Sequence, residues 1–464
     1  MAREEFDLII IGSGPGGYVA GIRAGQLGLK AAVVEKDPKF GGTCTHRGCI
    51  PTKALLHTAE VLDGIRDAAD LGIQVAEPAL DIAKAQDRKQ KVVDANAKGI
   101  EFLFRKNKVA GLHGTGRITG PHDVEVEGPD GKKAYGAKFI LIATGSVPRD
   151  IPIAPADGER ILNSDHILEL KQVPGSLAVL GAGAVGTEFA SIYTSFGTKV
   201  TLIEMLPRIL PIEDEEVSAE LHRALRKRGI EIMTGTKLQS AERTDTGVRL
   251  KLEGGKKDTV EAEMLLVAIG RKPVTENIGL EALGIELERG YVKVNPRMQT
   301  NVPHIYAIGD VINTPWLAHV ASAEGILAVE HMAGQPVKPI NYDRVPSCTY
   351  CDPEVASVGL TEAKARERGY DVQVGKFPLS ALGKARILGR TEGFVKVVRE
   401  KKYDELLGIH IIGVHATDLI AEACVALQLE GTDEELIRTM HAHPTLSEAV
   451  GEAAHAAHGA AIHI

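Results

Sequence analysis

Residues 8–17, LIIIGSGPGG, decide the fold of this chain. Four apolar residues, enough for a short buried strand, run directly into Gly12, Gly14 and Gly17, which are spaced as G-x-G-x-x-G. The first glycine permits a tight turn, the second lets a pyrophosphate approach the backbone, and the third lets a helix pack closely on the strand. The stretch therefore predicts the turn of a dinucleotide-binding βαβ unit.

The residues that follow complete this unit. A helical stretch covers Tyr18–Leu27, and a second strand, Ala31–Val34, ends at Glu35. The helix N-terminus offers its unpaired N–H groups and the positive end of its dipole to phosphates. A glutamate at the end of the second strand can accept two hydrogen bonds from a ribose diol, and it repels a 2′-phosphate.

The same pattern occurs a second time. A strand run at 177–180 leads into Gly181, Gly183 and Gly186, and a helical stretch and another strand follow up to Glu204. In both copies 23 positions separate the first glycine from the acid, from 12 to 35 and from 181 to 204. One glycine motif often marks a plain turn, but two copies with the same flanking elements predict two bound dinucleotides, and hence electron transfer between them.

A pair of cysteines follows the first copy. Residues 41–56 are GGTCTHRGCIPTKALL, with Cys44 and Cys49 five positions apart. A helix is expected to begin near Cys49, because Pro51 is favoured in a first turn, and the helix dipole together with Lys53 would stabilise a thiolate. Two ordinary buried cysteines are the alternative, and zinc is disfavoured because no second ligand pair has a matching spacing. The position beside a dinucleotide fingerprint favours a redox-active dithiol.

A candidate base for thiol chemistry lies near the C-terminus, in the stretch HAHPTLSEA at 441–449. Histidine suits this role because its ordinary pKa is ~6.5. Glu448 could fix the tautomer of His443 and stabilise its imidazolium form. It could instead cap a helix, since Thr445 and Glu448 form a T-x-x-E capping box. The other histidines of this region are expected to be surface or packing residues rather than metal ligands: His441, His455, His458 and His463.

With these motifs in this order, the chain resembles the pyridine nucleotide–disulfide oxidoreductase family over essentially its whole length. Further landmarks of the resemblance are ATG at 143–145, AIGR at 268–271 and YAIGD at 306–310. It implies an α/β fold with two Rossmann-like dinucleotide-binding domains, for FAD and NAD, plus a C-terminal α+β dimerisation domain. The expected segments are an FAD-binding domain at 1–147, an NAD-binding domain at 148–268, a central segment returning to the FAD domain at 269–345, and a dimerisation domain at 346–464.

The resemblance also implies roles for single residues. The FAD site would include Gly12, Gly14, Gly17, Glu35, Lys36, Gly42, Thr43, Lys53, Gly116, Thr144, Gly145, Ser146, Asp310, Leu317, Ala318 and His319. The NAD site would include Gly181, Gly183, Gly186, Glu204, Gly270 and Arg271, while Glu188 would pair with Lys53 near the flavin ring.

The implied reaction passes electrons from a dithiol substrate to a Cys44–Cys49 disulfide, then to FAD and then to NAD+. Cys44 resembles the interchange thiol, and Cys49 resembles the thiol that contacts the flavin. In the family, the histidine corresponding to His443, with the glutamate corresponding to Glu448, acts on the disulfide of the opposite subunit. A homodimer would therefore be a condition of activity.

The substrate can be narrowed within the family. Glu204 favours NAD over NADP, which disfavours an activity like that of glutathione reductase. The tail GAAIHI lacks the paired cysteines of mercuric reductase. The favoured substrates are dihydrolipoyl groups on lipoyl domains, attached to the E2 core of 2-oxo acid dehydrogenase complexes or to a glycine cleavage system. A non-catalytic FAD-binding subunit is the alternative of another class, and the intact Cys44, Cys49 and His443 argue against it.

Two of the departures from the family pattern concern cysteines or their neighbours. Thr45, His46 and Arg47 stand between the cysteines, where the family usually has Leu-Asn-Val. His46 and Arg47, beside the disulfide, could favour a thiolate or an anionic partner, or they could face solvent, which we expect. Cys348 and Cys351 form an additional C-x-x-C without a dinucleotide turn or helix start, so we expect them to be non-catalytic.

The composition agrees with an ordinary globular enzyme. The 464 residues are too many for one core, 44% are hydrophobic and 25% charged, and the net charge of −8 leaves no basic footprint for nucleic acid. There is no apolar run long enough for a bilayer and no basic-then-apolar leader. The sequence therefore predicts a cytoplasmic protein without bound metal, unless a targeting leader has been removed.

Overall fold

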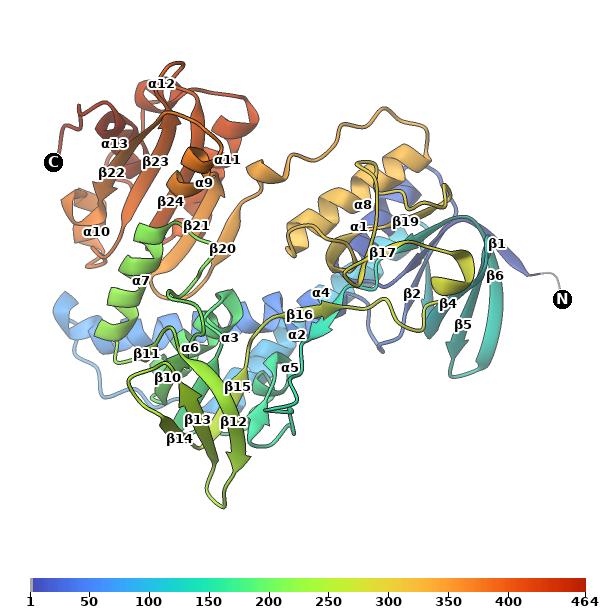
Figure 1. Ribbon diagram of the computed structural model, residues 1–464, viewed down its shortest axis with the longest axis horizontal. Coiled ribbons are helices and arrows are strands. Elements are labelled where there is room, and N and C mark those ends of the chain that lie inside the picture. The colour runs from blue at the N-terminus through green and yellow to red at the C-terminus, as the bar shows by residue number, and fades with distance from the viewer. Residues whose placement is uncertain (1–2) are drawn as a thin grey trace. The chain divides into compact units, whose positions relative to one another are not determined.

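The computed structural model describes residues 3–464, and the contacts between them divide the chain into two units (Figure 1). Unit 1 contains the residues up to Ala54, Gln86–Arg149 and Arg271–Tyr342. Unit 2 contains Leu55–Ala85, Asp150–Gly270 and Asp343–Ile464. Each unit is thus assembled from three separate segments of the chain.

Unit 1 is built on a seven-stranded sheet in the order β3-β2-β1-β6-β5-β4, with β19 also paired to β6. Five of its strands are parallel to their neighbours: β1 (Glu4–Ile11), β2 (Ala31–Glu35), β3 (Ala110–His113), β6 (Gly131–Ile142) and β19 (Ile305–Ala307). Two more extend the sheet in antiparallel fashion: β4 (Thr115–Gly120) and β5 (Asp123–Gly128). Leu8, Ile9 and Ile10 are fully buried in β1, as an apolar run in a parallel sheet should be.

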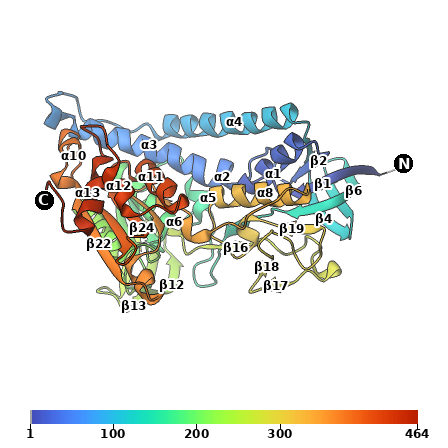
Figure 2. The ribbon, with the colours of Figure 1, turned by 90° about the horizontal axis from the view of Figure 1, so that it is seen from above.

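Two helices of unit 1 pack against each other, α1 (Pro15–Gln26) and α8 (Ala318–Met332) (Figure 2). A Cβ on Gly325 would lie 2.7 Å from the carbonyl oxygen of Gly16, so this close approach depends on glycine. Helix α1 begins three residues before the predicted Tyr18, because Pro15 suits the first turn, where its missing N–H costs nothing.

The other elements of unit 1 are short or are shared with unit 2. Helix α2 (Gly42–Arg47) belongs to unit 1, whereas α3 (Cys49–Arg66) and α4 (Ile82–Lys106) carry residues of both units. Two antiparallel pairs complete unit 1: β7 (Ser146–Pro148) with β16 (Arg271–Pro273), and β17 (Leu287–Glu288) with β18 (Tyr291–Val292).

Unit 2 contains a second parallel sheet, in the order β11-β10-β9-β15-β8. Its strands are β8 (Ile161–Leu162), β9 (Ser176–Leu180), β10 (Lys199–Ile203), β11 (Glu231–Met233) and β15 (Met264–Val267). The associated helices are α5 (Ser164–Ile167), α6 (Ala184–Ser195) and α7 (Glu215–Lys227). A three-stranded antiparallel sheet is formed by β12 (Lys237–Arg243), β13 (Val248–Glu253) and β14 (Thr259–Ala262). The predicted second copy of the strand–turn–helix pattern is therefore present as β9, α6 and β10.

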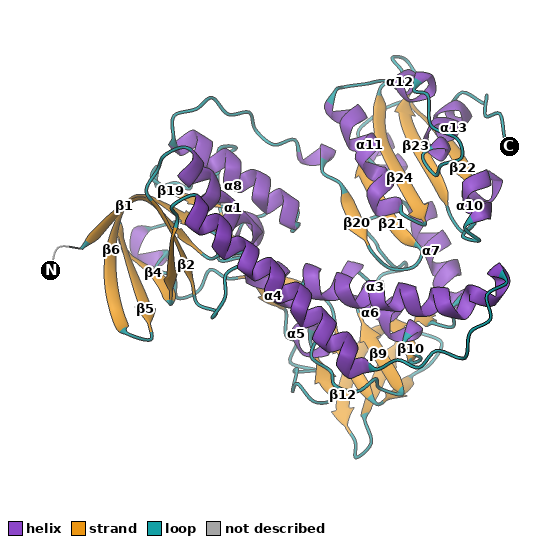
Figure 3. Cartoon of the chain, turned by 180° about the vertical axis from the view of Figure 1, so that it is seen from behind, coloured by secondary structure: helices purple, strands orange, loops and turns teal. Residues whose placement is uncertain are grey.

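The C-terminal part of unit 2 is an antiparallel sheet with helices packed on it (Figure 3). Its strands, in spatial order, are β20 (Ser347–Thr349), β21 (Glu354–Gly359), β24 (Leu406–Gly413), β23 (Phe394–Glu400) and β22 (Val372–Pro378). Its helices are α9 (Glu362–Glu367), α10 (Gly383–Ile387), α11 (Ala416–Gln428), α12 (Asp433–Arg438) and α13 (Glu448–Ala457). Helix α11 packs on β21 and β24, and α13 packs on β22 and β23.

A buried lysine connects this sheet to α7. Lys396 is 2% exposed, and its Nζ lies 3.0 Å from Asp214, 2.8 Å from Glu216 and 3.0 Å from Glu362. Burial alone would lower the pKa of Lys396, but the three carboxylates raise it above its ordinary value. A buried charge requires such pairing, so this cluster ties together elements that are far apart in sequence.

Short 3-10 turns lie at Asp67–Leu71, Glu281–Leu283, Gly309–Val311, Tyr342–Arg344 and Leu379–Ala381. Between residues 3 and 464, no helix combines the length and the apolar character that a membrane span requires.

Candidate active site and cofactor-binding residues

The first glycine turn has the geometry that the sequence predicts. Gly12 has φ +106°, and a Cβ there would collide with the carbonyl of Ala143. A Cβ on Gly17 would collide with the Gly12 carbonyl, because α1 packs tightly on β1. Nothing lies within 4 Å of a Cβ on Gly14. The outer glycines therefore serve packing, and the middle one faces open space that a phosphate can enter.

The second turn repeats this division of roles. Gly181 has φ +100°, and a Cβ there would lie 2.5 Å from the carbonyl oxygen of Ala268. A Cβ on Gly186 would collide with the Gly181 carbonyl, whereas one on Gly183 would meet nothing within 4 Å. The helices that follow the two turns, α1 and α6, have no side-chain cap at their N-termini. Their backbone N–H groups suit a pyrophosphate, so both sites fit a dinucleotide.

The two acids lie at equivalent places in the two copies. Glu35 is buried and accepts hydrogen bonds from the backbone N–H of Ser13 at 3.2 Å and from the Ser13 hydroxyl at 2.5 Å. Glu204 is also buried and accepts one from the backbone N–H of Ala182 at 2.7 Å. Each carboxylate is thus held against its glycine turn, at the end of the second strand, where a ribose is expected.

A hydrogen-bonded network lies among the residues expected at the flavin. Ser146 donates its hydroxyl to Asp310 at 2.5 Å, and Arg271 donates to the Ser146 hydroxyl at 2.7 Å. Thr144 donates to the carbonyl of Val274 at 2.6 Å. Burial raises the pKa of Asp310, and the Ser146 hydroxyl and the Arg271 charge partly offset this. Arg271, expected near the nicotinamide dinucleotide, is in this structure bonded to Ser146, which was expected at the flavin.

The remaining expected flavin residues are dispersed over unit 1. A Cβ on Gly42, the first residue of α2, would lie 2.6 Å from the Cα of Gly14, so the cysteine helix begins against the first glycine turn. Gly116 lies in β4, and a Cβ there would lie 3.1 Å from side-chain carbons of Ile11 and Val34. The others are placed as follows: Lys36 exposed after β2, Thr43 in α2, Lys53 in α3, Gly145 before β7, and Leu317, Ala318 and His319 at the start of α8.

The cysteine pair comes together between two helices. Cys44 lies in α2, and α3 begins at Cys49, as expected from Pro51. The side chain of Cys49 is hydrogen-bonded to that of Cys44, and this bond together with burial raises the pKa of Cys44. Lys53 acts in the opposite direction but is the weaker influence. The contact with Cys49 and burial thus disfavour a thiolate at Cys44 in this arrangement.

The side chains between the cysteines make contacts within unit 1. Thr45 is buried, His46 bonds the carbonyl of Phe40 through Nε2 at 2.9 Å, and Arg47 pairs with Asp37 at 2.5 Å. The expectation that His46 and Arg47 face solvent is therefore incomplete, because both are only partly exposed and each is bonded to unit 1. These contacts fix α2 within unit 1.

The candidate base and its acid meet in unit 2. His443 Nδ1 lies 2.8 Å from Glu448 Oε1, and Glu448 Oε2 accepts the backbone N–H of Thr445 at 2.8 Å. Burial raises the pKa of Glu448, but the Thr445 N–H and His443 outweigh it, and the net pKa lies below its ordinary value. Helix α13 begins at Glu448, with Ser447 as its N-cap and without a side-chain cap, so the capping box of Thr445 and Glu448 is not formed. The bond to His443 is the one of the two expected roles that Glu448 fulfils.

Two further expected residues lie in unit 2. Glu188 is buried in α6 and accepts the backbone N–H of Tyr350 at 3.0 Å. Gly270 has φ +114° just after β15. Lys53 and the cysteines belong to unit 1, so the pairing of Glu188 with Lys53 and the approach of His443 to a disulfide stay predictions.

The additional C-x-x-C has a different environment from the first. Cys351 is 1% exposed, and its thiol donates to the carbonyl of Pro353 at 3.2 Å. Burial raises the pKa of Cys351 well above its ordinary value, and Glu188 adds to this effect. Cys348 lies in β20, which is not a helix start. This environment suppresses a thiolate, in keeping with the non-catalytic interpretation.

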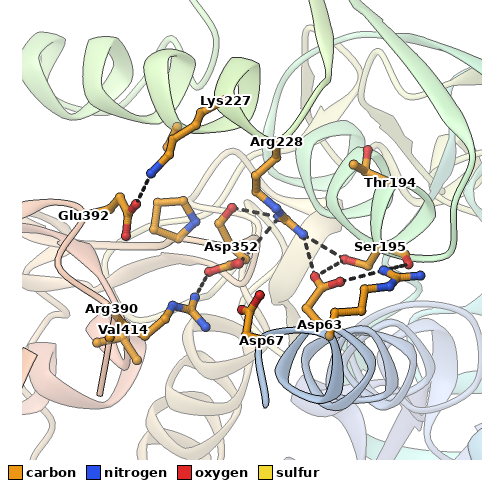
Figure 4. A pocket seen from close by; sticks show the side chains of 14 residues that line it. Asp63, Asp67, Thr194, Ser195, Lys227, Arg228, Asp352, Arg390, Glu392 and Val414 are labelled. Atoms are coloured by element: carbon orange, nitrogen blue, oxygen red, sulfur yellow. Dashed lines mark hydrogen bonds and ion pairs between the residues drawn. The ribbon is translucent and has the colours of Figure 1, made fainter. Parts of the chain in front are cut away.

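A polar pocket of about 420 Å³ lies in unit 2, where the ends of α3, α6 and α7 meet the turn after β20 (Figure 4). Arg228 projects into it and donates to Asp63 at 2.9 Å, to Ser195 at 2.8 Å and to the carbonyl of Asp352 at 2.9 Å. Lys227 pairs with Glu392 at 2.8 Å. The pocket's charges neutralise one another, and none of the residues expected to hold a cofactor lines it.

Two acids and a histidine resemble a metal site, but the guanidinium of Arg399 already lies among them. Asp404, Asp433 and His458 have ligand atoms within 4.8 Å of one another. Arg399 pairs with both Asp404 and Asp433, at 3.2 Å for the latter. Because the guanidinium already neutralises the carboxylates, we assign no metal there.

Two dinucleotide folds, a hydrogen-bonded cysteine pair beside the first and a histidine–glutamate pair together define a pyridine nucleotide- and flavin-dependent disulfide oxidoreductase. Comparison with known proteins agrees. Residues 6–325 match the family described as "Pyridine nucleotide-disulphide oxidoreductase", and residues 345–454 match its dimerisation domain. The chain belongs to this family, whose members use FAD and NAD, and it carries the family's dimerisation domain.

Several relatives cover nearly the whole chain. It is 48% identical to the dihydrolipoyl dehydrogenase of Bacillus subtilis, over 99% of both chains. It is 41% identical to the mitochondrial dihydrolipoyl dehydrogenase of Pisum sativum, over 99% of this chain and 93% of that one. Among solved structures, LpdA of Mycobacterium tuberculosis superposes with a TM-score of 0.91 at 29% identity, over 97% of this chain and 99% of that one. The flavoprotein disulfide reductase RclA of Escherichia coli gives 0.87 at 27%, over 98% and 99%.

Proposed function

We propose that this protein oxidises dihydrolipoyl groups to the cyclic disulfide and reduces NAD+ to NADH. The observation that carries the proposal is the cysteine pair. Cys44 and Cys49 are hydrogen-bonded to each other, and helix α2, which carries Cys44, starts against the open glycine turn of the first dinucleotide site. Full-length likeness to dihydrolipoyl dehydrogenases supports the choice of substrate.

The chain's own groups would carry out the thiol exchange. A substrate thiol loses its proton to His443 and attacks Cys44 of the Cys44–Cys49 disulfide, and Cys49 leaves as a thiolate. His443 passes its proton to the Cys44 sulfur as the second substrate thiol displaces that sulfur, and it takes up the proton of this second thiol. The lipoyl ring closes, and both protein sulfurs are reduced. Glu448 holds His443 in one tautomer throughout and stabilises its protonated form. FAD, which Glu35 and the first glycine turn would hold, would supply the acceptor for the electron pair of the dithiol and the hydride donor for NAD+.

Glu204 supports NAD+ as the acceptor. Its carboxylate is held at the end of β10, against the second glycine turn. A 2′-phosphate at the ribose would bring a second negative charge to this buried acid, and such juxtapositions cost several kcal/mol. We expect kcat/KM to be lower with NADP+ than with NAD+ by about 100-fold or more.

The packed Gly181 and the open Gly183 allow a direct test of the second dinucleotide site. Gly181→Ala should lower Tm by about 5 °C, because it introduces both a disfavoured φ and a collision with Ala268. Gly183→Ala should leave Tm unchanged, since its methyl meets no atom, yet raise the KM for NAD+ about tenfold by obstructing the pyrophosphate. Thermal unfolding and steady-state kinetics measure both. An unchanged KM in Gly183→Ala would place the nucleotide elsewhere.

The proposed partners follow from the substrate. We propose a cytoplasmic homodimer in which His443 of one copy serves the cysteine pair of the other. Lipoyl domains attached to the E2 core of a 2-oxo acid dehydrogenase complex would bring the dithiol. The dimerisation domain at 345–454 supports a second copy of this chain as a partner.

One set of assays tests the function as a whole. The purified protein should be yellow, reduce NAD+ with dihydrolipoamide, and show no activity with glutathione disulfide and NADPH. A colourless protein would contradict the flavin assignment. A yellow protein that reduces glutathione disulfide with NADPH but ignores dihydrolipoamide would replace the substrate.

A further inference from the structure

A second histidine of the C-terminal motif is held between two helices. His441 is 11% exposed, and its Nε2 lies 2.6 Å from Oε1 of Glu422 in α11. On the other side, the ring lies against α13, where a Cβ on Gly451 would be 3.3 Å from its Nδ1. The imidazole therefore fills the space between α11 and α13, with one nitrogen bonded and the other against a glycine.

This clamp lies two residues from the candidate base, in a segment without regular structure. Residues 439–447 join α12 to α13 and contain neither helix nor strand. His443 itself is 79% exposed, so packing does little to hold its ring. On the C-terminal side, the segment is tied by the Thr445 N–H to Glu448 at 2.8 Å and by the Thr445 hydroxyl to the carbonyl of Ala442 at 2.7 Å.

We propose that His441, clamped by Glu422 and Gly451, is a positioning residue for His443. The inference rests on the proposed function, in which His443 is the base. The hydrogen bonds of Thr445 hold only the α13 end of the 439–447 loop. The bond from His441 to Glu422 holds the other end of the loop to α11. With both ends fixed, the backbone at His443 has one orientation, and its Nδ1 stays on Glu448 while Nε2 points outward. Misplacing a catalytic group by about 1 Å can cost about 100-fold in rate.

His441 is not itself placed to act on a substrate. One ring nitrogen is occupied by Glu422, and the other lies against Gly451 in the interior. A group that touches the reacting sulfurs needs an accessible nitrogen, as His443 has. The role of His441 is therefore to act through His443.

Two substitutions at His441 distinguish the loss of its hydrogen bond to Glu422 from the loss of its ring. In the FAD-loaded protein, His441→Leu removes the bond to Glu422, while His441→Gln keeps an N–H donor that can reach the carboxylate. We expect kcat with dihydrolipoamide to fall about 10- to 100-fold in the leucine variant and to recover largely in the glutamine variant. NADH-driven reduction of ferricyanide should be unchanged in both, because that reaction takes electrons from the flavin and needs no thiol base.

A double variant tests whether His441 acts through His443. If it does, His441→Leu combined with His443→Gln should be no slower than His443→Gln alone, because residues that act as one unit are not additive. Multiplied losses in the double variant would overturn the inference. If the leucine variant fails to fold, Glu422→Gln combined with His443→Gln asks the same question. His458→Gln is the matched control, since it removes another histidine–carboxylate bond, 2.9 Å to Asp433, and should affect Tm rather than kcat.

The outcomes also separate this inference from the proposed function. Near-normal dithiol turnover in His443→Gln would reject His443 as the base, and with it the positioning role of His441, while the proposed reaction itself would stand. A crippled His443→Gln beside a His441→Leu with unchanged kcat would reject the positioning role alone.

Discussion

Replacing either Cys44 or Cys49 by serine is expected to abolish reduction of NAD+ by dihydrolipoamide, with a loss of about 10⁴-fold or more. A serine hydroxyl cannot form the mixed disulfide or accept the electron pair as a thiolate. The loss should appear in kcat, measured at saturating substrate. NADH-driven reduction of ferricyanide should persist, because it bypasses the dithiol.

The second cysteine pair supplies the control for this experiment. Cys348→Ser alters the additional C-x-x-C, whose other member is buried with a raised pKa. It should retain activity within about twofold, as a change away from the reacting groups does. Substantial dithiol turnover in Cys44→Ser, or a collapse of turnover in Cys348→Ser, would show that the wrong pair had been assigned.

His443→Gln is expected to lower dithiol turnover by about 10²- to 10⁴-fold while FAD remains bound. Glutamine can still bond Glu448 but cannot take up a thiol proton near neutral pH. This proton transfer is needed because the thiolate, not the thiol, of the substrate attacks the disulfide. The pH dependence of kcat/KM should also lose the limb due to the histidine, which a structural defect would not produce.

A second histidine–glutamate pair, which also uses a carboxylate of α13, is a suitable control. His463 Nδ1 lies 2.8 Å from Glu452, one turn beyond Glu448 on α13. His463→Gln removes an equally close pair that makes no hydrogen bond to the dyad, and its charge is the smallest of the influences that lower the pKa of Glu448. The variant should therefore keep the histidine limb of the pH profile. An equal loss in the two variants would indicate that His443 stabilises α13 rather than serving as a base.

The local steric features were predictable from the sequence. Gly12 and Gly181 occupy positive φ, and Pro51 lies in the first turn of α3. Each of these depends on a few neighbouring residues, because backbone sterics and first-turn geometry act over one turn of chain. The two cysteines are also only five positions apart, and so are His443 and Glu448.

The roles of Glu448 show where sequence reasoning stopped. Its spacing allowed either a helix cap or a bond to His443, and spacing cannot choose between them. The structure decides this, since α13 starts at Glu448 with Ser447 as an N-cap without a side-chain bond, while Glu448 bonds His443. The contacts of His46 and Arg47 were missed for a similar reason, since their partners, Phe40 and Asp37, lie outside α2.

By itself, then, the sequence determined the two strand–glycine–helix copies, the close cysteine pair and the candidate base with its glutamate, because these need only short-range geometry. Tertiary structure alone decided the clamp of His441 on Glu422, the buried Lys396 among three carboxylates and the Arg228 pocket. Their partners lie 19 to 182 positions apart in the chain. Over such separations, pairing is set by how helices and sheets pack and by the high cost of leaving a buried charge without a partner.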